Sequence, residues 1–190
     1  EAIRHFDVAL EHASASRTDT GHSQTDVLLA RIRLAKGDCL QALGLPDEAK
    51  REITLAVEIA ERLGQVPLLA RAHRMLLMVH LWSGPAHRAW AHARSAVALA
   101  EQSGERNLAW SAHWSAAVLA ALTAHTSALE THLKEAARLA TELNSPLLEL
   151  RTMEIAIEYR AGTGEWDRAI LDGERAIAMG RALDQTTLLA

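Results

Sequence analysis

Gly44-Leu-Pro-Asp-Glu-Ala49 is the stretch that decides the fold, because its pattern returns along the chain. Gly84 and Ala89 keep the same spacing 40 residues later, and Gly164-Glu-Trp-Asp-Arg-Ala169 keeps it again 120 residues after the first. Glycine often ends a helix because it adopts left-handed backbone without strain, and a nearby proline suits the first turn of the next helix. The stretch therefore predicts the turn of a helical hairpin.

Four columns of similar residues share the spacing of 40. The columns are Leu28, Leu68, Leu108, Leu148 and Leu188; Gly44, Gly84, Ala124 and Gly164; Ala56, Ala96, Ala136 and Ala176; and Gly64, Gly104, Asn144 and Asp184. We expect the leucines to open the first helix of each hairpin and face the core, and the second column to end that helix in left-handed backbone. The alanines should let the second helix pack closely, and the fourth column should end it.

These columns predict an all-α protein, an α-α superhelix of antiparallel helical hairpins with a 40-residue period. The first helices are expected over 24–43, 66–83, 106–122 and 146–162, and the second helices over 46–63, 86–103, 126–143 and 166–183. One solenoid would fill 1–190, with a partial repeat at 1–15, full hairpins at 24–63, 66–103, 106–143 and 146–183, and the start of a truncated repeat at 186–190. We expect a longer loop from Ser16 to Ser23, and we interpret the chain as a piece cut from a longer array.

The turn strings resemble the tetratricopeptide (TPR) signature, in which a glycine closes the first helix and an alanine follows in the second. The hairpin with Ala124 and Leu129 in those places departs from the signature, and the period of 40 exceeds the usual one of about 34. Another kind of α-solenoid therefore stays open as an alternative.

A narrower resemblance rests on Ala60-Glu-Arg-Leu-Gly64 followed by Leu68-Leu-Ala-Arg71. These segments are similar to the helical-repeat regions of large bacterial signalling proteins, the ATP-binding LuxR-type transcriptional regulators of the maltotriose-activator group and related ATPase or kinase fusions. The resemblance implies a region that links a nucleotide-binding switch to an output domain and binds inducers or regulatory proteins. The 190 residues themselves contain no Walker motif, kinase loop or helix-turn-helix motif.

The composition favours a soluble cytoplasmic protein with a packed core, since 49% of the residues are hydrophobic. The net charge is −4 and the two signs are interspersed, which argues against a nucleic-acid or anionic membrane surface. No apolar stretch reaches the roughly 18 residues of a membrane-spanning helix. Cys39 is the only cysteine, so it cannot form an intramolecular disulfide.

A binding groove is expected on the first helices, which line the concave face of such a superhelix. Its three rows are Arg31, Arg71, Ser111 and Arg151; Leu34, Arg74, Trp114 and Glu154; and Asp38, Met78, Val118 and Glu158. The residues that we assign to a ligand or peptide groove are Arg31, Arg71, Arg74, Met78, Trp114, Arg151 and Glu154. Arginines beside a tryptophan can hold a carboxylate by paired hydrogen bonds and stacking. The alternative is a solvated surface of ion pairs, such as Arg151 with Glu154 or Glu158.

Histidine is frequent, with ten residues. His73 and His113 share one repeat position and His92 and His132 another, so stacked repeats could bring each pair close. The sequence has no HExxH or CxxC motif, and Cys39 and the acids do not fall at ligand spacing, so we predict no metal site and no cofactor.

Aromatic residues and the cysteine are expected to pack rather than react. Trp110 and Trp114 lie one turn apart and should fill the gap between hairpins. Trp166 should anchor the last hairpin from beneath, and Cys39 should be a small buried apolar residue.

The function expected from this pattern is a non-catalytic protein–protein interaction or regulatory scaffold. No glycine-rich phosphate loop or distinct nucleophile set supports an enzyme. The partner would be a protein, a peptide or another domain of the parent chain, not nucleic acid or a membrane. The alternative is a small-molecule effector sensor with its ligand in the concave groove around Arg71, Arg74 and Trp114. Exposed terminal repeats also predict a possible homodimer.

Overall fold

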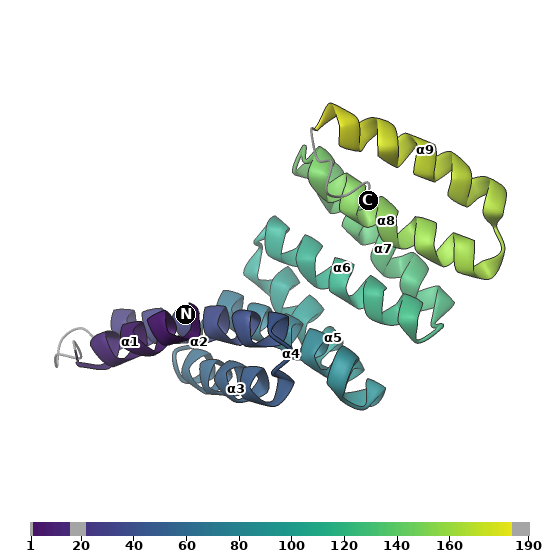
Figure 1. The fold of residues 1–190 in the computed structure, drawn as a ribbon. Helices are drawn as coiled ribbons and strands as arrows, with labels where there is room; N and C mark the ends of the chain where they lie inside the picture. Colours follow the sequence, from purple (N-terminus) through teal and green to yellow (C-terminus); the bar gives the residue numbers. More distant parts are fainter. Residues whose placement is uncertain (1, 16–21, 184–190) are drawn as a thin grey trace. The chain divides into compact units, whose positions relative to one another are not determined.

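The computed structural model describes residues 2–15 and 22–183, and in those residues it contains nine α-helices and no strand (Figure 1). The helices are α1 (Ala2–Ala15), α2 (His22–Ala42), α3 (Pro46–Arg62), α4 (Val66–Ser83), α5 (Ala86–Ser103), α6 (Arg106–Leu122), α7 (Thr126–Glu142), α8 (Pro146–Thr163) and α9 (Trp166–Ala182). The all-α prediction is confirmed for the described residues, and every predicted helix end lies within two residues of the observed one. The predictions for residues 16–21, Asp184 and 186–190 lie outside the described residues, and the expected loop ends earlier because α2 begins at His22.

Most turns between helices are closed by the backbone itself. After α2, the Leu45 N–H donates to the Leu40 carbonyl at 2.9 Å and the Gly44 N–H donates to the Gln41 carbonyl at 3.0 Å. This pair of bonds is the Schellman motif, which needs a left-handed residue after the helix. The same pair of bonds recurs around Gly64, Ala124, Asn144 and Gly164, which all have positive φ. The second and fourth sequence columns therefore end helices as expected at these positions.

Gly84 is the exception in the second column, because its φ of −141° and ψ of −180° are extended rather than left-handed. Pro85 follows directly, and the residue before a proline is forced toward extended backbone. A Cβ atom added to Gly84 would lie 2.5 Å from Nδ1 of His80. Glycine is needed here for a close approach to a histidine, not for a left-handed turn.

The alanine column lies in the core, as predicted, since Ala56, Ala96, Ala136 and Ala176 are at most 7% exposed. The leucine column faces the core at Leu68 and Leu108, but Leu28 is 49% exposed and that part of the prediction is wrong. In α2 the buried stripe runs through Asp26, Leu29 and Ala30, which are at most 5% exposed, and Leu28 lies off that stripe.

The chain divides into two compact units, residues 1–108 and 109–190, which we describe separately. In the first unit α1 packs on α2, α2 on α3, α3 on α4 and α4 on α5, and α2 also contacts α4. In the second unit α7 packs on α8 and α8 on α9. No helix in the described part of the chain combines the length and apolar character that a membrane-spanning segment needs.

Candidate functional site

Three of the predicted groove arginines belong to the first unit, Arg31 on α2 and Arg71 and Arg74 on α4, and these two helices contact each other. Arg31 and Arg71 are exposed, and Arg74 is half-buried. Burial lowers the pKa of Arg74, the nearby Asp38 carboxylate opposes that shift, and Arg71 adds to it. We call these three arginines the cationic surface of the first unit.

One arginine of this surface already has an acidic partner. Nη2 of Arg71 lies 3.2 Å from Oε2 of Glu105, the residue that follows the turn after α5. Both side chains are about half exposed, so an anion from solution can replace the carboxylate at little cost. Met78 is half-buried on the same helix, whereas Leu34 is buried and takes no part in the surface.

The second unit holds the other predicted residues, and here they contact one another. The indole Nε1 of Trp114 donates to the Arg151 carbonyl at 3.0 Å, and the Arg151 guanidinium lies 3.8 Å from the Glu154 carboxylate. Burial raises the pKa of Glu154, Arg151 opposes that rise, and Glu158 adds to it. Arg151 and Glu154 thus form an ion pair of the kind that the alternative expects, and the groove to which they were assigned stays a prediction.

The tryptophans of α6 fill space between helices, as predicted. Trp110 donates from Nε1 to Oγ1 of Thr152 on α8 at 3.2 Å, and its ring stacks on Trp114 with centroids 6.1 Å apart. Trp114 also reaches α8. Trp166 does not anchor its hairpin, because it is 62% exposed and its Nε1 lies near the Gly164 turn, at the surface. Cys39 is half-buried rather than buried.

The histidines pair within hairpins, which sequence reasoning missed. Nδ1 of His73 lies 3.0 Å from Nδ1 of His92, and the ring of His80 stacks on His92 at 5.3 Å with planes only 7° apart. In the second unit Nδ1 of His113 lies 3.0 Å from Nδ1 of His132. In each pair the two histidines are 19 residues apart in the sequence, and this repeated spacing was the sequence signal for the contact.

Two imidazoles at this distance share one hydrogen bond, so one ring must be the neutral acceptor. Burial, together with repulsion from His73, His80 and Lys50, lowers the pKa of His92 to about 4. Burial also lowers the pKa values of His73 and His80. Within the described residues, no group of three or more His, Cys, Asp or Glu side chains has the geometry to hold a metal ion.

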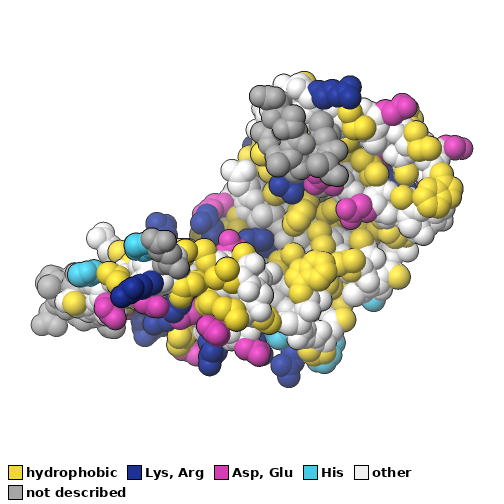
Figure 2. Space-filling model, in the orientation of Figure 1, with side chains coloured by type: hydrophobic (Ala, Val, Ile, Leu, Met, Phe, Trp, Pro, Cys, Tyr) yellow, Lys and Arg dark blue, Asp and Glu magenta, His cyan; other side chains and the backbone are white. Residues whose placement is uncertain are grey.

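The two signs of charge are mixed over α1 and α3 in the space-filling view (Figure 2). Lys36 illustrates this mixing, with Asp7 at 2.7 Å and Glu52 at 2.6 Å. A comparison with models of known protein families finds no match, and a search of curated proteins finds none either.

Proposed function

We propose that this chain is a non-catalytic scaffold that binds an acidic segment of a protein or peptide, or of another domain of its parent chain. In this proposal the hairpins form a TPR-like superhelix with a period of 40 residues over residues 1–190. The chain would be the repeat region of a larger bacterial signalling or transcriptional regulator in the cytoplasm. The repeated turns and the buried alanine column support the repeat architecture.

The observation that carries the binding proposal is the cationic surface of the first unit. Arg31, Arg71 and Arg74 come from two first helices that contact each other, and the Asp38 carboxylate acts on Arg74. Guanidinium groups hold carboxylates through paired, charge-assisted hydrogen bonds, each worth roughly 1.5–3 kcal/mol. An acidic peptide that displaces Glu105 from Arg71 would gain such contacts without a net loss of ion pairs.

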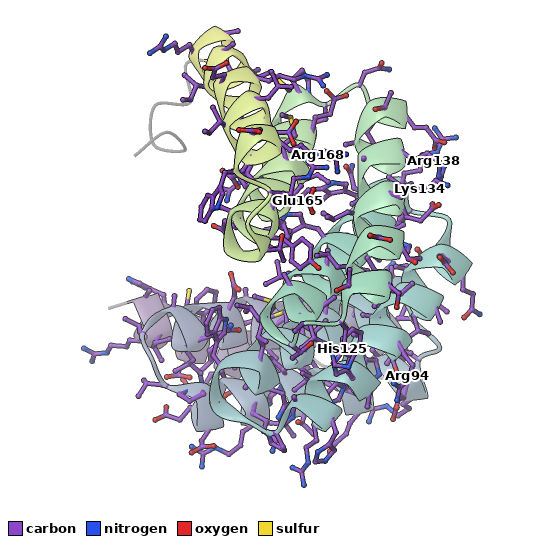
Figure 3. The ribbon with its side chains drawn as sticks, turned by 90° about the vertical axis from the view of Figure 1, so that its right-hand side faces the viewer. Arg94, His125, Lys134, Arg138, Glu165 and Arg168 are labelled. Carbon is purple, nitrogen blue, oxygen red and sulfur yellow. The ribbon has the colours of Figure 1, made fainter. Side chains whose placement is uncertain are left out.

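The test is fluorescence anisotropy with a labelled peptide pool of acidic and apolar residues and a second pool in which lysine replaces each acid. We expect saturable binding of the acidic pool that weakens about tenfold in the double variant Arg31→Gln, Arg71→Gln. The matched control is Arg51→Gln, Arg94→Gln, which removes two exposed arginines from the second helices α3 and α5 and should bind as the wild type does. Arg94 is labelled in Figure 3. Equal binding of both pools, or an equal loss in the control, would contradict the proposal.

The effector-sensor alternative stays a prediction, as does the homodimer. Arg71 and Arg74 belong to the first unit and Trp114 to the second. Trp114 is engaged with Trp110 and the Arg151 carbonyl, which favours a packing role for it. The scaffold proposal needs no contribution from Trp114.

A further inference from the structure

A pocket of about 360 Å³ opens between α7, α8 and α9 in the second unit. We propose that it binds a small amphipathic acid, a molecule with an apolar body and one carboxylate, phosphate or sulfonate group. This inference is independent of the peptide surface in the first unit. The volume lies at the lower end of the range for small-molecule sites.

The apolar part of the lining, which we call the floor of the pocket, comes from two helices. Leu133 and Ala137 belong to α7, and Met153 and Ala156 belong to α8. Ala156 contributes only a methyl group to this lining. The residue 80 positions earlier in the sequence, Leu76 of α4, is larger and is 5% exposed.

The charged residues of the pocket lining come from different helices. Lys134 comes from α7 and Arg175 from α9, and among the described residues neither has an acidic partner within salt-bridge distance. Lys134 and Arg138 lie on the same helix in Figure 3, but Arg138 is paired with Glu135 and Glu142. Lys134 and Arg175 are thus available to an anion.

The remaining charges of the lining are already engaged. Arg160 forms an ion pair with Asp172, and Glu149 accepts a hydrogen bond from Thr141 at 3.3 Å. Three cationic residues (Lys134, Arg160 and Arg175) against two acids (Glu149 and Asp172) leave one net positive charge. The pocket therefore favours an anionic ligand over a neutral or cationic one of equal size.

The probe is 8-anilinonaphthalene-1-sulfonate, with N-phenyl-1-naphthylamine as the neutral analogue that lacks the sulfonate. Fluorescence titration of the folded chain should show one saturable site for the sulfonate. Ala156→Leu, which introduces the residue found at position 76, should weaken that binding at least about tenfold by filling the floor. The double variant Lys134→Gln, Arg175→Gln should weaken the sulfonate about tenfold and leave the neutral analogue within about twofold.

The matched control is Arg138→Gln, Arg168→Gln, which removes one cation from each of the same two helices outside the pocket. It should leave both titrations within about twofold of the wild type. Circular dichroism shows whether each variant is folded. If Ala156→Leu does not fold, the comparison of the two charge variants alone tests the proposed site. Equal loss in the control, equal loss for both probes, or no loss in the Lys134 and Arg175 variant would overturn the proposal.

Discussion

The hairpins α4–α5 and α8–α9 place different residues at positions that correspond 80 residues apart, and this changes the space between their helices. In the first, His73, His80 and His92 form a stacked and hydrogen-bonded cluster, with Leu76 buried beside them. In the second, the same places hold Met153, Arg160, Asp172 and Ala156, and a pocket lies there. Helix α4 accordingly buries eight residues and α8 only three.

The same helical frame holds a packed histidine cluster in one hairpin and an open pocket in the other. Helix ends depend on local turn chemistry, which the two hairpins largely share. The filling between helices depends on a few side chains, and these differ. Each substitution described below changes one of these two hairpins.

The largest expected loss of unfolding free energy comes from removing a buried side chain in the hairpin α4–α5. Leu76→Ala removes a side chain that is 5% exposed, and such a change costs roughly 2–5 kcal/mol of unfolding free energy. Ala156→Leu, the reverse exchange at the matching position, fills existing space and should change that free energy by less than about 1.5 kcal/mol. Urea unfolding followed by circular dichroism compares the two, and equal losses would refute the comparison.

A smaller loss of unfolding free energy is expected from substitutions at the turn glycines of the two hairpins. Gly84→Ala puts a Cβ atom 2.5 Å from His80 Nδ1, and this overpacking should cost roughly 1–3 kcal/mol. Gly164→Ala meets no such atom but must keep a φ of +85°, which costs about 1–2 kcal/mol. Gly162→Ala in α8 has open space and is the control. Thermal unfolding should rank Gly84→Ala as the most destabilised, and a neutral result there would show that His80 moves freely.

Acid should lower the stability of the hairpin α4–α5 through its histidine cluster. The pKa of His92 falls from 6.5 to about 4 on folding, so the unfolded chain binds a proton that the folded cluster does not. Stability from this group is complete above about pH 6.5 and declines as the pH falls toward 4. Lys50 and Arg88 repel a proton on the cluster, while Glu61 attracts one to His73.

The measurement is the unfolding midpoint between pH 7.5 and 4.5, taken above and below the ordinary histidine pKa of about 6.5. His92→Gln should flatten the fall, and His5→Gln, at an exposed position of α1, should not. If both variants keep the wild-type slope, the cluster does not control the acid response.

The smallest effect is expected at the ion pair of the second unit. Arg151 and Glu154 are 46% and 30% exposed and 3.8 Å apart, so Arg151→Gln should cost no more than about 0.5 kcal/mol. Removing the guanidinium should raise the pKa of Glu154 further, since Arg151 opposes its rise. Nuclear magnetic resonance titration of the carboxylate measures that direction, and a fall would contradict it.

The helices and their ends were predictable because they depend on residues close together in sequence. Pro46 and Pro146 start helices, and Gly44 and Gly164 end them through local hydrogen bonds. The extended backbone of Gly84 did not follow from its column, because Pro85 directly after it favours extended backbone over the left-handed conformation of the other glycines.

The site was less predictable, because it depends on which side chains meet across helices. The groove positions of the arginines on α2 and α4 were predicted from repeat spacing, and the Arg151–Glu154 pair was predicted from the spacing of three residues along one helix. The His73–His92 contact needed the geometry of one hairpin rather than of stacked repeats. The pocket could not be foreseen from Ala156, since an alanine predicts open space only when the neighbours fail to close over it.

We propose that an acidic peptide binds to the first helices of the first unit, and an amide chemical-shift titration of the labelled chain with the tightest-binding acidic peptide tests this directly. We expect saturable shifts that are largest near Arg31 on α2 and Arg71 on α4. Shifts that are largest on α3 and α5, or that do not saturate, would contradict it.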